Sequence, residues 1–324
     1  MAGDNQEIVA SINPDRIPVL QPYAQLFGSA IEVKADINRD TKDMSMTGTL
    51  RSDNLSVDAD AVERKSGFEF SRLRVAANSP LMIFPDMSAS VGSFVFDGRA
   101  VMTEEISASG QTSFENIVYN DYHIARISGP VVLGFKDGTA GFDIDLTGSV
   151  DNDSALKAWS GRAPKIVAAG EYSLDQKALS LYKGNIRVPG VNAAVTGNAN
   201  FSEKQAKLKG TYRLNKAALG LSLPADISGT FTTGNHRDGI QVAYDGTAKN
   251  ISTLPEPLFS LLGQTVNFNG NAILDRANTL RIPAFSASST GLTVRAIGSR
   301  TASGQIEANI DYETDPFVVS LVET

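Results

Sequence analysis

The sequence has 324 residues, of which 42% are apolar and 20% are charged, and its net charge is −7. Acidic and basic residues are scattered, which excludes the basic stripe of a nucleic-acid-binding protein, so we expect no nucleic-acid partner. The absence of cysteine excludes disulfides and thiolate chemistry. No run approaches the roughly 18 apolar residues of a membrane span, and no signal-peptide pattern is present, so we interpret the chain as an excised piece of a longer protein.

Alternation of apolar and polar residues predicts strands along most of the chain. In order, these are 29–38, 44–50, 55–61, 68–75, 91–96, 142–150, 166–174, 191–201, 206–214, 225–231, 240–248, 266–272, 279–287, 292–298 and 305–312. Tight turns such as Lys136–Gly138 and Arg237–Gly239 indicate antiparallel pairing. Four short helices are expected at 15–27, 154–159, 216–221 and 254–262.

The predicted fold class is therefore all-β, a long curved antiparallel sheet with a few short helices. The chain is expected to form one continuous segment over residues 1–324. It can be divided into sub-units at 13–150, 151–250 and 251–324.

A glycine recurs within an apolar-polar-glycine-polar-apolar pattern seven times, at Gly48, Gly148, Gly197, Gly210, Gly229, Gly246 and Gly270. Each glycine falls on the apolar face of its strand. Two readings stay open. The glycines let the sheet curl into a concave apolar channel, or they make room for bulky neighbours in an ordinary sandwich.

One-sided apolar strands need a cover, because each buried Val, Ile, Leu or Phe stabilises by roughly 1.5–3 kcal/mol. That cover could be a second sheet, a partner chain or lipid.

Catalytic motifs are absent from the sequence. His123 and His236 have no metal-type spacing, and Asp36, Asn38 and Asp40 only begin a calcium-loop pattern, without its glycine and glutamate. No nucleophile elbow, dinucleotide fingerprint or phosphate loop is present. We therefore expect no enzyme activity, no cofactor and no metal.

Residues 254–310 resemble the TamB family, the inner-membrane component of the translocation and assembly module of Gram-negative bacteria, and the wider AsmA-like group. The likeness lies in a short apolar helix, Leu254–Leu262, followed by Phe268-Asn-Gly270, Leu280-Arg-Ile282-Pro-Ala284 and Gly291–Ala296. The resemblance implies a taco-shaped hydrophobic β-groove in the periplasm, anchored to the inner membrane in the full-length protein. It also implies phospholipid acyl chains as cargo and an outer-membrane barrel partner of the Omp85 type.

The expected function is intermembrane phospholipid transport linked to outer-membrane assembly. The residues expected to line the groove are Phe142, Ile144, Leu146, Val150, Ile227, Phe231, Val242, Tyr244, Val266, Phe268, Leu292, Val294, Ile306 and Ile310. One alternative is a chaperone-like scaffold that templates outer-membrane β-barrel proteins by strand augmentation. Another is a structural β-sandwich or β-solenoid of a surface fibre.

Overall fold

The computed structural model of the chain describes residues 4–16, 27–39, 44–77, 81–84, 89–119, 122–150, 163–188, 190–203, 205–214, 226–251, 262–275, 279–301 and 303–314. Two compact units divide the chain. Unit 1 comprises Met1–Lys157 with Arg162–Ile166, and unit 2 comprises Ala158–Gly161 with Val167–Thr324.

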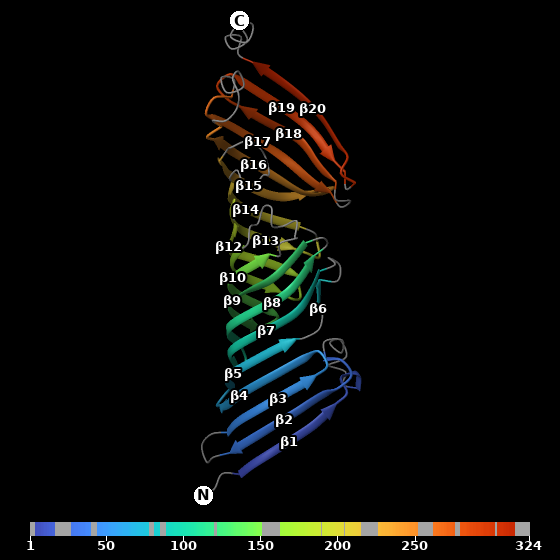
Figure 1. Cartoon of the computed structure of the whole chain (residues 1–324), viewed down its shortest axis with the longest axis vertical. Helices are drawn as coiled ribbons and strands as arrows, with labels where there is room; N and C mark the ends of the chain where they lie inside the picture. Colours follow the sequence, from blue (N-terminus) through green and yellow to red (C-terminus); the bar gives the residue numbers. More distant parts are fainter. Residues whose placement is uncertain are drawn as a thin grey trace. The chain divides into compact units, whose positions relative to one another are not determined.

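Unit 1 is an antiparallel meander in which, apart from β5 and β6, consecutive strands pair with each other (Figure 1). Its strands are β1 (Asp4–Ile12), β2 (Ile31–Arg39), β3 (Met44–Ser52), β4 (Leu55–Arg64), β5 (Gly67–Ala77), β6 (Leu81–Phe84), β7 (Ala89–Met102), β8 (Ile106–Tyr119), β9 (Tyr122–Lys136) and β10 (Thr139–Val150). The short β6 pairs with the start of β7, while β5 pairs with the rest of β7.

Unit 2 repeats this plan. β11 (Lys165–Ser173) contributes residues to both units, and unit 2 continues with β12 (Ala178–Val188), β13 (Val191–Asn200), β14 (Gln205–Leu214), β15 (Asp226–His236), β16 (Gly239–Lys249), β17 (Thr265–Asp275), β18 (Leu280–Ser288), β19 (Leu292–Arg300) and β20 (Ile306–Thr314). From β12 to β20 every neighbouring pair is antiparallel. No pairing among the described residues joins the first and last strands of either unit, so the predicted all-β, open antiparallel class is confirmed.

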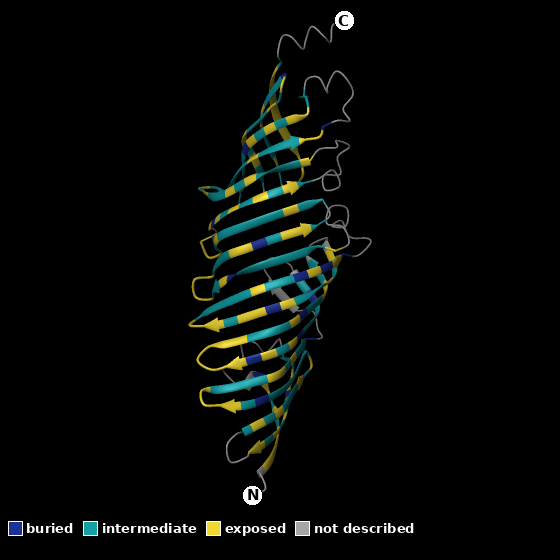
Figure 2. Ribbon diagram, turned by 90° about the vertical axis from the view of Figure 1, so that its left-hand side faces the viewer, coloured by how far each residue is buried: buried dark blue, intermediate teal, exposed yellow. Residues whose placement is uncertain are grey.

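Alternating burial follows from the alternating sequence, because successive strand residues point to opposite faces. In β2, Ile31 is buried, Val33, Ala35 and Ile37 are half-buried, and the polar residues between them are exposed. Figure 2 shows the same alternation of exposed and less exposed positions along many strands. Each unit therefore has an apolar face and a polar face, named below as the apolar face and the outward face.

Five strands were not predicted from the sequence: β1, β6, β8, β9 and β12. β8 is rich in serine and β9 contains Pro130 between glycine and valine, and both features normally weaken a strand assignment. Pairing on both sides overrides these preferences, since β9 is bonded to β8 and to β10.

The predicted helices at 154–159 and 216–221 lie outside the described residues, as do nearly all of those at 15–27 and 254–262. Where the first helix was expected to begin, a 3-10 helix, η1, spans Pro14–Arg16. Of the predicted turns, Lys136–Gly138 joins β9 to β10. Both Asp137 (φ 46°) and Gly138 (φ 72°) are left-handed there, as a two-residue hairpin turn of type I′ requires.

Candidate functional site: an apolar trough

The apolar face of unit 1 contains a cavity of about 480 Å³, here called the trough. Five neighbouring strands supply its lining: Leu73 and Val75 of β5, Phe94 and Phe96 of β7, Ala108, Thr112 and Phe114 of β8, Val131 and Leu133 of β9, and Ile144 and Leu146 of β10. Four strand spacings of about 4.8 Å make its span roughly 19 Å across the sheet. Its volume lies within the roughly 300–1,000 Å³ typical of ligand pockets.

Strand register explains why the middle of the trough is open. One row across the five strands reads Leu73, Gly98, Gly110, Val131 and Ile144, and each residue is directly opposite the next. The second and third members, Gly98 and Gly110, have no side chain, so bulkier residues surround a stretch of bare backbone. A Cβ at Gly98 would lie 2.2 Å from the carbonyl oxygen of Ser109, so the backbones of β7 and β8 approach too closely for any other residue. Such glycine kinks bend a sheet.

The trough is electrically neutral. Its one hydroxyl, on Thr112, donates to the carbonyl oxygen of Val95 at 3.1 Å, and the Thr112 residue is only 7% exposed. Among the described residues of β5 and β7–β10, no charged side chain falls on the apolar face. Charges pair on the outward face instead, as between Arg74 Nη1 and Asp97 Oδ2 at 3.2 Å. The lining can therefore bind hydrocarbon, but it offers a polar group almost no hydrogen-bond or charged partner.

The four predicted lining residues of unit 1 share the apolar face of β10. Ile144 and Leu146 line the trough, and Phe142 stands beside them opposite Leu133. Val150 is 8% exposed and follows a β-bulge that shifts its partner to Ile124, so it is packed and does not line the trough.

The other nine residues of the trough were not among the predicted lining residues. Leu73, Val75, Phe94 and Phe96 lie in strands that the alternation did predict, so that pattern could have identified them. Those on β8 and β9 carry a weaker signal, because β8 is rich in serine and Val132 interrupts the alternation of Val131, Leu133 and Phe135 on β9.

The ten predicted lining residues of unit 2 also share one face. Register places Phe231 opposite Tyr244, and Tyr244 opposite Gly270. By register, the remaining members are on the same face: Ile227, Val242, Val266, Phe268, Leu292, Val294, Ile306 and Ile310. Period-two reasoning therefore assigned the face of these residues correctly. No described cavity of unit 2 is lined by them as a group; Phe231 and Ile310 each contribute to a separate hollow.

Aromatic rings lie over the glycines of this face. A Cβ at Gly210 would fall 2.7 Å from the Phe231 ring, and one at Gly246 would fall 2.5 Å from the Phe268 ring. The Tyr244 hydroxyl would be 2.6 Å from a Cβ at Gly270. Burial also raises the pKa of Tyr244 above that of an ordinary phenol. In unit 2 these glycines therefore make room for bulky neighbours, which was one of the two readings of the repeat.

Three other repeat glycines have different surroundings. Gly48 has its nearest neighbour at 3.6 Å, so the space around it is ordinary. Gly148 packs against the Pro164 ring, which would be 2.8 Å from an added Cβ. Gly197 has φ +134°, and a Cβ there would lie 2.2 Å from the Lys207 carbonyl oxygen, so it is a backbone kink. These six glycines thus share a sequence pattern without sharing one role.

Two departures from simple alternation occur near the end of unit 2. Ile273 is on the outward face of β17, yet it is only 8% exposed, while Leu274 on the apolar face is 46% exposed; both lie beside a β-bulge of the neighbouring strand β18. On β20, Ile306 and Ile310 lie on the apolar face, yet they are 71% and 64% exposed. They are therefore the least covered of the predicted lining residues.

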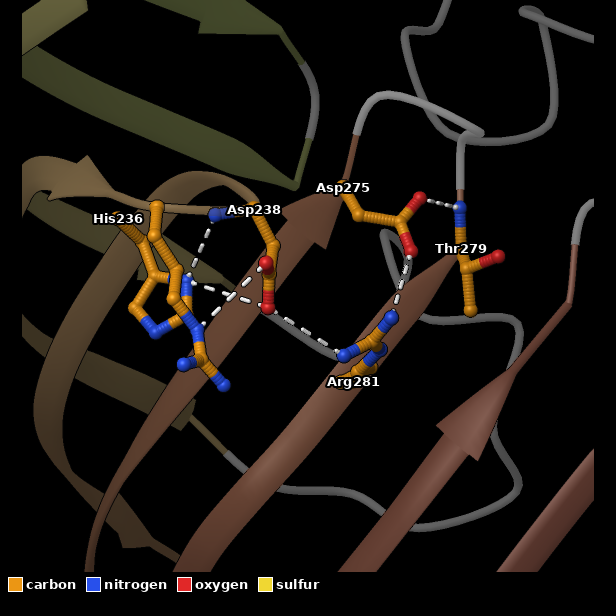
Figure 3. Close-up of polar contacts among 6 residues, drawn as sticks. His236, Asp238, Asp275, Thr279 and Arg281 are labelled. Carbon is orange, nitrogen blue, oxygen red and sulfur yellow. Dashed lines mark hydrogen bonds and ion pairs between the residues drawn. The ribbon is translucent and has the colours of Figure 1, made fainter.

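A polar cluster joins two hairpins of unit 2 (Figure 3). Arg281 of β18 lies 3.5 Å from Asp238 in the β15–β16 turn and 3.2 Å from Asp275 at the end of β17. The imidazole Nδ1 of His236 accepts a hydrogen bond from the Asp238 backbone at 3.2 Å. The groups of this cluster bond to one another, so the cluster is best explained as a link between two turns at the surface. Over the described part of the chain, no group of three or more His, Asp or Glu side chains is arranged to hold a metal ion.

Within the described ranges, no helix is long and apolar enough to cross a membrane. No protein-family model matches the chain, and no curated protein matches it either.

Proposed function

We propose that the chain is a non-enzymatic β-groove that carries phospholipid acyl chains between the membranes of a bacterial envelope. The observation that carries this proposal is the trough, a neutral apolar cavity on the face of an open sheet. Each methylene transferred from water into such a site contributes about 0.8 kcal/mol, so about ten buried methylenes supply roughly 8 kcal/mol before binding costs. The outward face keeps its ion pairs in water.

The resemblance to the TamB family supports the cellular part of the proposal. On that basis the chain works in the periplasm, the full-length protein is anchored to the inner membrane, and an outer-membrane barrel of the Omp85 type is the partner. The face of unit 2 that carries Phe231, Tyr244 and Phe268 would offer acyl chains an apolar surface of its own, with its aromatic rings spread over glycine backbones.

The test is lipid occupancy of the purified chain, measured by organic extraction and mass spectrometry. We expect stoichiometric phospholipid in the wild type and a large loss in Ile144→Asp, because a carboxylate in the trough costs several kcal/mol to desolvate. Thr147→Asp, on the outward face of the same strand, is the matched control and should retain lipid. Lipid-free wild-type protein, or equal occupancy in both variants, would refute the proposal.

A second candidate function rests on β20. Ile306, Ile310 and Tyr312 are 71%, 64% and 75% exposed on one face of this strand. Among the described strands, β20 pairs only with β19, which leaves its other edge open to an incoming strand. The chain would then act as a scaffold that templates outer-membrane β-strands.

The scaffold is tested with a labelled synthetic peptide from an outer-membrane barrel strand. Binding should survive Ile144→Asp but fail in one of two variants in which proline replaces Ala308 or Asn309, because successive residues of a strand direct their amides to opposite edges and one of these two amides therefore points away from β19. Unchanged peptide binding in both proline variants would refute the scaffold function.

A further inference from the structure

A basic patch covers the outward face of β12–β14, although the chain as a whole has a net charge of −7. Strand register places five cations there, which are Lys183, Arg187, Lys207, Lys209 and Arg213. The intervening strand β13 presents Asn192, Ala194, Thr196 and Asn198 on this face and no acid. None of the five cations has an ion pair with another described residue, so their charges are not compensated locally.

A hollow of about 510 Å³ crosses this patch from β12 to β15. Each of the four strands contributes a run of consecutive residues, three from β13, β14 and β15 and four from β12. These runs include Gly184, Val195, Gly210 and Phe231, which are in one row on the apolar face. Their backbones therefore form the floor on the outward side, and the residues before and after them form two parallel walls. Three strand spacings make the hollow about 14 Å long.

The walls carry hydroxyl, amide and ammonium groups. One wall contains Asn185, Thr211 and Thr230, and the other contains Lys183, Thr196, Lys209 and Thr232. The nearest acids in neighbouring strands are engaged. Asp245 of β16 accepts from the Thr230 hydroxyl, and Glu171 of β11 accepts from the Tyr182 hydroxyl at 2.6 Å.

Tyr182 stands at the β12 end of the hollow and is 60% exposed. A β-bulge sets Tyr182 and Lys183 together against a single residue of β13, and the bond to Glu171 fixes the phenol. An exposed ring that is held still beside hydroxyl-bearing walls offers a stacking surface at low entropic cost.

We propose that this hollow binds an acidic oligosaccharide of about three sugar units. Lys183 and Lys209 pair with its acidic groups, the threonine and asparagine side chains bond its hydroxyls, and Tyr182 stacks on a terminal ring. The two walls leave a narrow channel between them, and a narrow channel fits a linear glycan better than it fits the flat surface of a membrane. The site lies on the outward face of unit 2, so it does not depend on the trough of unit 1.

The experiment is a ¹⁵N NMR titration of the whole chain with trigalacturonate at low salt, where exposed charges are least screened. We expect shifts of the amides around Thr196 and Thr211, and affinity at least tenfold weaker in Lys209→Gln. Lys34→Gln removes the same charge from the outward face of unit 1 and should change affinity less than twofold. Tyr182→Ala should weaken binding while circular dichroism stays unchanged.

Neutral maltotriose and inorganic phosphate separate the two halves of the proposal. Both should bind at least tenfold more weakly than trigalacturonate, because each satisfies only one part of the site. Equal binding of either ligand would overturn the proposal. So would equal losses in Lys34→Gln and Lys209→Gln, or binding to phosphatidylglycerol vesicles that displaces the glycan and withstands Tyr182→Ala.

Discussion

Filling the trough with protein should expel its ligand without unfolding the sheet. Ala108 faces the trough opposite Ala100 and Leu133, so Ala108→Phe would place a ring in the open space. If about 100 Å² of that ring is buried, burial contributes roughly 2.5 kcal/mol to folding, from which about 1 kcal/mol of side-chain entropy is subtracted. The free energy of unfolding should therefore stay the same or rise slightly.

Ligand affinity should move in the opposite direction. A ring that displaces about four methylenes of a bound acyl chain removes roughly 3 kcal/mol, which weakens binding by about a hundredfold. Displacement of a fluorescent fatty acid measures the affinity, and urea unfolding measures the stability. Ser107→Phe adds the same ring on the exposed outward face of β8 and serves as the control. Unchanged affinity in a folded Ala108→Phe would refute the assignment of the trough as the acyl site.

Two further predictions concern the stability of variants at the repeat glycines and the pKa of Asp53. Gly210→Ala should lower the free energy of unfolding by about 1–3 kcal/mol, because the new Cβ meets backbone at 2.1 Å and the Phe231 ring at 2.7 Å. Gly48→Ala, where the nearest atom is at 3.6 Å, should raise it by about 0.5–1 kcal/mol; urea unfolding that ranks the two variants the other way would contradict the packing described. The backbone N–H and then the hydroxyl of Ser29 lower the pKa of Asp53 below its ordinary 3.8, so their contribution to stability is present above that pH and is lost as the pH falls through the lowered value. Ser29→Ala should raise the Asp53 pKa part of the way back in a ¹³C carboxyl titration, and an unmoved pKa would show that the hydroxyl has no such effect.

Local alternation was sufficient to predict which face most side chains occupy. Ile144, Leu146, Phe231, Tyr244 and the other predicted lining residues all share the apolar face of their unit, because the period of a strand is a property of the backbone itself. Alternation did not predict the burial of Ile273 or the exposure of Leu274, because both lie beside a bulge of β18, and a bulge in a neighbouring strand changes local packing without changing which face a residue occupies. It also missed β9, whose Pro130 is a weak strand former held in place by pairing on both sides.

By itself, the sequence determined the all-β class, the antiparallel turns and the separation of apolar from polar faces. These depend on residues that are close together in the chain. Only the tertiary structure decided what each repeated glycine does, because Gly48 has ordinary space around it while Gly210 and Gly246 are covered by rings from neighbouring strands. It also brought five cations together on β12 and β14. The physical reason is the same in each case: register sets which residues of different strands become neighbours, and the alternation within one strand carries no information about register.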